Sequence, residues 1–197
     1  LPISRFSQTE KQAIHNDLLK KGEQLFAAGG LKKVTIDELA AAAHIAKATF
    51  YTFFESKEAL YLEIASQLQQ NIFNDLVTVL EKNKHKPPKV RVKEVFAAMA
   101  QMLADYPLLG QISEETVQRI ARRVSPQRLE AFAQSNVNAA EAMGQQGIQF
   151  TCETALASEA FEAVYHTWMH LQTKDTALAA PAIELVLDGL LDKIIME

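Results

Sequence analysis

TIDELAAAAHIAKATFYTFFESKEAL, residues 35–60, predicts two short helices joined by a tight turn and followed by the start of a third helix. Thr35 and Glu38 have the spacing of a capping box, in which each side chain accepts a hydrogen bond from the other residue's backbone N–H. The turn falls at His44-Ile45, and Ser56 is a residue type that caps helices. The segment therefore predicts a helix-turn-helix.

The second helix of this segment, residues 47–53, is barely two turns long. Isolated helices shorter than about 12 residues are marginal in water, so this one needs a scaffold behind it. We expect Phe50 and Phe54 to face that scaffold. The outward face would then be positive and rich in hydroxyls, which suits phosphate oxygens and base edges; it comprises Lys47, Thr49, Tyr51 and Thr52.

Composition favours an all-α protein of one or two domains. Of 197 residues, 48% are hydrophobic, while Gly and Pro number only 7 and 6. The single Cys152 cannot form an internal disulfide and provides too few thiols for a zinc site. Because the chain lacks an apolar run of 18 residues and a signal-peptide pattern, we expect a cytoplasmic protein without membrane contact.

Charge is distributed unevenly along the chain, whose net charge is −4. Residues 1–60 hold eight Lys or Arg against seven Asp or Glu, whereas residues 61–197 hold twelve against seventeen. Because DNA is a polyanion, we expect any DNA contact to lie in the N-terminal part.

Apolar periodicity and capping residues predict about nine helices. The N-terminal three-helix helix-turn-helix domain is expected at residues 1–55 and a C-terminal helical bundle at residues 56–197. Ser7 and Glu10 form a second capping box that opens a helix at 8–28, closed by Gly29-Gly30. The later helices run from Ser56 to the basic loop at 82–86, from Pro88 to Tyr106, and over 113–123, 126–147, 155–173 and 176–196. The basic loop is a solvated turn or, alternatively, a second DNA patch.

Residues 34–60, VTIDELAAAAHIAKATFYTFFESKEAL, resemble the TetR family of transcriptional repressors. The match covers the pattern Thr-x-x-x-[Ile/Leu]-Ala, then [Val/Ile]-Ser-Lys-Gly-Thr-[Phe/Leu]-Tyr-x-[Tyr/His]-Phe, then Ser-Lys-Glu-x-Leu. The resemblance implies an N-terminal DNA-binding domain, a C-terminal helical domain with a ligand cavity, and a two-fold dimer. By the same resemblance, Thr35 would contact phosphate and Tyr51 and Lys57 the DNA backbone, while the residues facing the major groove would be Lys47, Ala48, Thr49 and Thr52.

Five positions depart from the family pattern. Ala46 replaces the capping serine, which removes about 1 kcal/mol of N-cap stabilisation. His44 replaces the turn glycine, Ala48 replaces a second glycine, and Phe53 replaces a residue with a polar tip. Asp37 would bring a negative charge near DNA. We therefore expect modest affinity, or an operator whose backbone approaches differently.

Two further sets of residues are candidates for binding sites. An effector cavity for an apolar or aromatic small molecule is predicted from Phe96, Met99, Met102, Tyr106, Phe132, Met143, Phe150 and Trp168, each of which could instead be ordinary core. A dimer interface on the last two helices is predicted from Phe161, Val164, Tyr165, Leu187, Leu190 and Leu191.

The sequence predicts a ligand-responsive repressor dimer that a small molecule releases from an inverted-repeat operator. In double-stranded operator DNA the two recognition helices would lie roughly 34–36 Å apart. The alternatives are a helical ligand-binding or adaptor dimer that does not use its motif on DNA, and three small helices packed for stability alone. Metal binding by His166 and His170, one turn apart, competes with a simple surface pair. We expect no cofactor, and no catalytic motif predicts an enzyme.

Overall fold

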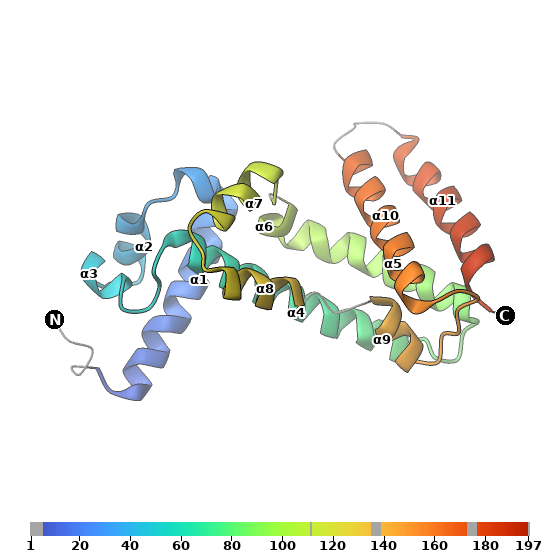
Figure 1. Cartoon of the computed structure of the whole chain (residues 1–197), viewed down its shortest axis with the longest axis horizontal. Coiled ribbons are helices and arrows are strands. Elements are labelled where there is room, and N and C mark those ends of the chain that lie inside the picture. Colours follow the sequence, from blue (N-terminus) through green and yellow to red (C-terminus); the bar gives the residue numbers. More distant parts are fainter. Residues whose placement is uncertain (1–5, 111, 135–138, 173–176, 197) are drawn as a thin grey trace. The chain divides into compact units, whose positions relative to one another are not determined.

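The protein is described by a computed structural model that covers residues 6–110, 112–134, 139–172 and 177–196. Within these ranges the regular secondary structure is helical (Figure 1), which confirms the predicted all-α class. The helices are α1 (Gln8–Lys33), α2 (Ile36–Ala42), α3 (Lys47–Phe50), α4 (Lys57–Lys82), α5 (Pro88–Asp105), α6 (Pro107–Gly110), α7 (Glu114–Ala121), α8 (Pro126–Gln134), α9 (Ala139–Gln145), α10 (Thr154–Gln172) and α11 (Ala179–Ile194).

The described ranges hold eleven helices, so the predicted number of about nine was too low. One addition is α6, a single turn that starts at Pro107, because the fixed φ of proline suits the first position of a helix. The other arises where one helix was predicted over 126–147 and the structure has α8 and α9. Residues 135–138 between them lie outside the described residues, as does the predicted start of the last helix at Thr176.

The ends of α1 follow from two local features. At its start, the Glu10 N–H donates to Ser7 Oγ over 3.2 Å and the Ser7 N–H donates to Glu10 Oε2 over 2.7 Å, which confirms the capping box. Near its end, Gly30 adopts φ 72° and ψ 159°, a conformation that glycine tolerates and residues with a Cβ rarely adopt. The regular helix is therefore interrupted at the predicted glycine pair, and one further turn reaches Lys33.

The chain divides into two compact units. The N-terminal unit comprises Leu1–Gln70 and Asp105–Asn136, and the C-terminal unit comprises Asn71–Ala104 and Val137–Glu197. The N-terminal unit thus includes the first half of α4 and helices α6 to α8 in addition to the helix-turn-helix. The domain boundary predicted between residues 55 and 56 stays a prediction.

In the N-terminal unit, α1 and α4 pack around large aromatic side chains. A Cβ on Gly22 would come within 2.9 Å of Ile64 Cδ1, so glycine permits a close approach of the two helices. The rings of Phe26 and Tyr61 meet edge to face with centroids 5.2 Å apart. The Tyr61 hydroxyl donates to the Leu108 carbonyl over 3.2 Å, and burial raises the pKa of Tyr61 to about 12. Tyr61 thereby fastens α6 to α4.

In the C-terminal unit, α10 and α11 pack against each other and help to enclose an apolar core. Arg91, only 6% exposed, donates from Nη2 to the carbonyls of Leu80 and Gln146 over 3.3 and 2.8 Å. It satisfies carbonyls near the ends of α4 and α9, where a cation is favourable. Phe150 and Ile195 form an antiparallel bridge.

Candidate nucleic-acid interface

The short helix α3 is held by two buried aromatic rings. Phe50 is fully buried and Phe54 is 1% exposed, and their ring centroids lie 6.0 Å apart. The two side chains face the interior of the N-terminal unit, as predicted. A helix of four residues is therefore stabilised by its tertiary contacts.

The turn between α2 and α3 depends on His44, which has φ 53°. It is the only residue other than glycine with a positive φ in the described ranges. The turn is closed by a 2.9 Å hydrogen bond from the Ile45 N–H to the Ala40 carbonyl. This confirms that histidine occupies the position of the turn glycine, where its left-handed conformation carries a cost.

The helix predicted over 47–53 ends at Phe50, and residues 51–53 form a turn. Lys47 and Ala48 of α3 and Tyr51 and Thr52 of this turn are exposed, with Tyr51 at 51%, while Thr49 is half-buried. The Thr52 hydroxyl donates to the Thr49 carbonyl over 2.6 Å. As predicted, Ala46 provides no side-chain cap for α3. The structure thus brings the residues predicted to face the major groove of DNA together on one surface. Their contact with DNA stays a prediction.

Lys47 is paired with Asp37, the acidic residue that departs from the family pattern. Its Nζ lies 2.8 Å from Asp37 Oδ2, and both side chains are largely exposed. The hydrogen bond and the charge of Asp37 raise the pKa of Lys47. Asp37 therefore competes for the ammonium group that would otherwise be available to DNA.

Thr35 and Glu38 form the predicted capping box at the start of α2. The Glu38 N–H donates to Thr35 Oγ1 over 3.2 Å, and Glu38 Oε2 accepts from both the N–H and the hydroxyl of Thr35 over 2.7 and 2.8 Å. These two bonds lower the pKa of Glu38. The hydroxyl of Thr35 already donates its hydrogen bond to Glu38. A phosphate could accept this hydrogen bond only by displacing the Glu38 carboxylate.

Lys57 joins the start of α4 to the end of α1. Its Nζ donates to the Val34 carbonyl over 2.5 Å and to the Lys32 carbonyl over 3.3 Å. Burial lowers the pKa of Lys57. The ammonium group therefore has a structural role beside the phosphate contact predicted for it, and one of its three donors is left for a phosphate.

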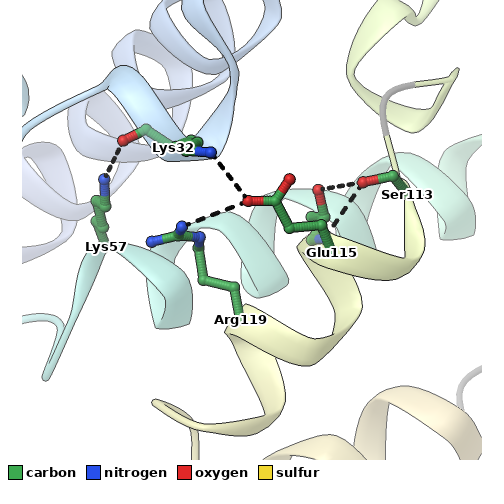
Figure 2. A network of polar contacts seen from close by, with 6 residues as sticks. Lys32, Lys57, Ser113, Glu115 and Arg119 are labelled. Atoms are coloured by element: carbon green, nitrogen blue, oxygen red, sulfur yellow. Dashed lines mark hydrogen bonds and ion pairs between the residues drawn. The ribbon is translucent and has the colours of Figure 1, made fainter.

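A groove of about 760 Å³ connects these residues with α7. Figure 2 shows one side of it, where Glu115 Oε1 lies 3.3 Å from Lys32 Nζ and 3.7 Å from Arg119 Nη2. The groove is lined by Thr35, Ile36, Asp37, Lys47, Tyr51, Glu55, Ser56, Lys57, Glu58, Glu115, Gln118, Arg119, Arg122 and Arg123. The α7 residues were not predicted, because no local pattern places them beside a motif that precedes them by between 57 (Glu58 to Glu115) and 88 (Thr35 to Arg123) positions.

The predicted effector residues do not line either of the two grooves found in the N-terminal unit. Tyr106 and Phe132 belong to the N-terminal unit, and the other six belong to the C-terminal unit. Met143 is buried in the core there, and Phe96 and Phe150 lie with ring centroids 5.7 and 6.0 Å from that of Phe161. Met99, Met102 and Trp168 are half-buried. The effector cavity stays a prediction.

The predicted dimer residues divide into core and surface positions. Phe161, Val164, Leu187 and Leu191 are buried within the C-terminal unit itself, so they cannot supply contact area to a second chain. Helical periodicity alone does not distinguish an internal core face from an interface face. Tyr165 and Leu190 are half-buried. Among the described residues of α10 and α11, the most exposed large apolar side chains are instead Leu156, Leu185 and Val186.

Two other kinds of site find no support among the described residues. No group of three His, Cys, Asp or Glu side chains there is placed to hold a metal ion, and His166 lies 3.3 Å from Glu162 in a surface pair. Over the same ranges, each helix is too short or too polar to span a bilayer.

Comparison with known proteins agrees with this geometry. Residues 18–64 match the family described as bacterial regulatory proteins, tetR family. The HTH-type transcriptional repressor DhaR of Mycobacterium sp. (strain GP1) is 32% identical over 93 residues, which cover 46% of this chain and 45% of DhaR. The chain spans about half or less of the length of the curated relatives it matches.

Solved structures share the fold over nearly the whole chain. A TetR-family regulator from Mesorhizobium loti MAFF303099 has a TM-score of 0.65 at 15% identity, covering 97% of this chain and 100% of that one. Thermus thermophilus FadR, a TetR-family repressor solved with lauroyl-CoA, has a TM-score of 0.61 at 20% identity, covering 93% and 96%. The chain thus carries the helix-turn-helix of the tetR family over residues 18–64, and its fold is that of solved TetR-family regulators.

Proposed function

We propose that the protein is a DNA-binding repressor that acts as a dimer on an inverted-repeat operator and is released by a small apolar effector. The observation that carries the proposal is the four-residue helix α3, whose polar face is exposed while Phe50 and Phe54 hold it in place. A helix this short contributes little to the core beyond these anchors. The exposed lysine of α3 and the exposed hydroxyls of Tyr51 and Thr52 directly after it suit the edges of bases and the phosphate backbone.

The proposed dimer uses the apolar surface of α10 and α11. Leu156, Leu185 and Val186 are 60%, 76% and 48% exposed. Helices of this kind associate readily into four-helix bundles. A two-fold arrangement would place two copies of α3 in successive major grooves, roughly 34–36 Å apart.

Release by an effector requires a difference in affinity. A ligand shifts the dimer away from DNA only if it binds one separation of the two recognition helices more tightly than the other. Helix α4 contributes residues to both compact units and is the candidate for transmitting that difference. The apolar composition of the C-terminal unit and the lauroyl-CoA bound by T. thermophilus FadR support an effector with an acyl or aromatic portion.

The test begins with duplexes selected by the protein from a random library. Binding to a selected duplex and to random duplex is then measured by fluorescence anisotropy between 50 and 300 mM salt, conditions under which a DNA-binding protein weakens steeply. Steep dependence with a preference for the selected duplex is the expected result. Binding that does not depend on salt would favour an adaptor dimer instead.

The effector is tested separately, by titrating lauroyl-CoA and a series of aromatic acids into the complex with the selected duplex. The expected result is release of DNA by at least one compound. If none changes DNA affinity, the proposed release is wrong while DNA binding stands.

A further inference from the structure

Arginine side chains at the end of α7 share the groove with the predicted DNA contacts. Arg119 lies in the last turn of α7, Arg122 is its C-cap and Arg123 follows directly, and all three line the groove. The same groove is lined by Lys47 and Tyr51. The end of α7 is therefore an immediate neighbour of the helix-turn-helix within the N-terminal unit.

A hydrogen bond fixes this end of α7 against the start of α4. The Ser56 hydroxyl donates to the Arg123 carbonyl over 3.4 Å, and Ser56 Oγ accepts from the Ala59 N–H over 3.1 Å as the cap of α4. The start of a helix carries a partial positive charge and free N–H groups, which favour phosphate. Arg122 and Arg123 therefore add their charges beside a helix start that already favours an anion.

The charges in the groove are not all equally available. Glu115 is paired with Arg119 and Lys32, Asp37 is paired with Lys47, and Glu58 is buried. Arg122 and Arg123 are exposed and form no ion pair within the part of the chain that the structure describes. The carboxylate left to balance these two guanidinium groups is that of Glu55, which is exposed. This part of the surface therefore keeps an excess of positive charge.

We propose that Arg122 and Arg123 bind phosphates of the DNA backbone and extend the interface beyond the helix-turn-helix. The inference rests on the proposed function, because it names a further part of the same interface. Arginine suits the role, since its planar guanidinium can donate two parallel hydrogen bonds to one phosphate. Phosphate contacts carry no direct sequence information, so the pair strengthens binding to every duplex alike.

The competing explanation is that both arginines only stabilise α7. Cations at the C-terminal end of a helix interact favourably with its dipole. That explanation predicts that their removal lowers the stability of the protein and leaves the salt dependence of DNA binding unchanged. The two explanations therefore differ in a measurable quantity.

The experiment uses the full chain with random duplex and with a selected duplex, and compares the wild type with Arg122→Ala, Arg123→Ala and the double variant. Arg128→Ala is the matched control, because Arg128 is an exposed arginine of α8 in the same unit and does not line the groove. Arg122→Lys/Arg123→Lys retains both charges. The unfolding midpoint of each variant in urea is measured alongside.

We expect each alanine substitution to reduce the slope of log K against log salt by about 0.9 for every protomer bound, because one counterion fewer is released. The ratio of affinities for selected and random duplex should stay constant, and the lysine variant should keep most of the slope. If the double variant has the same slope of log K against log salt as Arg128→Ala, the inference is wrong. Salt-dependent DNA binding by the wild type would still support the proposed function. Wild-type binding without salt dependence would overturn both.

Discussion

The surface at α3 and the turn after it differs in its exposed side chains from the surface of α11. The first presents Lys47, Tyr51 and Thr52, whereas the second includes the exposed apolar side chains Leu185 and Val186. Behind both surfaces lies a similar interior of aromatic and aliphatic side chains. The difference is thus confined to the surface, and it supports the proposal that DNA contacts one region and a second copy of the chain contacts the other.

The largest effect is expected from removing the interior support of α3. Phe50→Ala should lower the free energy of unfolding by about 3–5 kcal/mol, because a fully buried ring leaves a cavity. Tyr51→Ala is the matched control on the next residue, which is half exposed and keeps only an edge contact with the Phe50 ring, and it should cost about 1 kcal/mol or less. Urea unfolding measures both. Equal losses would mean that α3 does not have distinct inner and outer faces.

The apolar face of the C-terminal unit is tested with Leu185→Glu. A carboxylate at the centre of the proposed interface should weaken dimerisation by about 2 kcal/mol or more, which is roughly 30-fold in the dissociation constant. Sedimentation equilibrium measures this change. Val117→Glu, an exposed apolar position in the N-terminal unit, should leave dimerisation unchanged. A dimer that tolerates Leu185→Glu would place the interface elsewhere.

Lys57→Ala tests whether one side chain serves both the fold and the DNA contact. Losing its hydrogen bonds to the carbonyls of Lys32 and Val34 should cost about 1 kcal/mol of stability. If Lys57 also binds phosphate, the salt slope should fall by about 0.9 for each protomer. Lower stability with an unchanged slope would limit Lys57 to its structural role.

Asp37→Asn should make the surface around α3 more positive, because it removes the carboxylate that pairs with Lys47. Removing the carboxylate frees Lys47 for phosphate and increases the salt slope by up to about 0.9 for each protomer. Anisotropy titrations of random duplex measure the change. Asp105→Asn, the same substitution at an exposed position of the N-terminal unit, is the control. Equal effects of the two variants would show that overall charge, and not the Asp37–Lys47 pair, limits binding.

The smallest effect concerns pH. The pKa of Glu38 lies below its ordinary value of 4.5 in the folded protein, because its carboxylate accepts two bonds from Thr35. Its stabilising contribution is therefore present above the ordinary pKa and is lost as the pH falls through the lowered one. Glu38→Gln should destabilise the protein slightly at pH 7 and less at pH 3, measured by urea unfolding.

Sequence predicted the features that depend on neighbouring residues. The two capping boxes, the inward faces of Phe50 and Phe54, the strained turn at His44 and the uncapped start of α3 all arise from residues within about ten positions. The capping boxes follow from local spacing alone, whereas the predictions for His44 and Ala46 came from comparison with the family pattern.

Features that depend on distant contacts were not predictable. The bond from Ser56 to Arg123 spans 67 positions, and nothing local to either residue indicates it. The same limit applies to Phe161 and Leu191, since an apolar stripe on a helix fits an internal core as well as a subunit interface. The role of Lys57 was incomplete for this reason too, because its carbonyl partners lie 23 and 25 positions earlier.

Helices α6 to α8 belong to the N-terminal unit although residues 71–104 separate them from the rest of it in the sequence. This arrangement affects how the unit folds during synthesis of the chain. The hydroxyl of Tyr61 requires the carbonyl of Leu108, so the packing around it cannot be completed when the helix-turn-helix first leaves the ribosome. At about 5–20 residues per second, residues 105–136 follow the motif after a delay on the order of 2–15 seconds. During that interval the nascent motif lacks part of its support, and a chaperone that shields its aromatic side chains would have time to act.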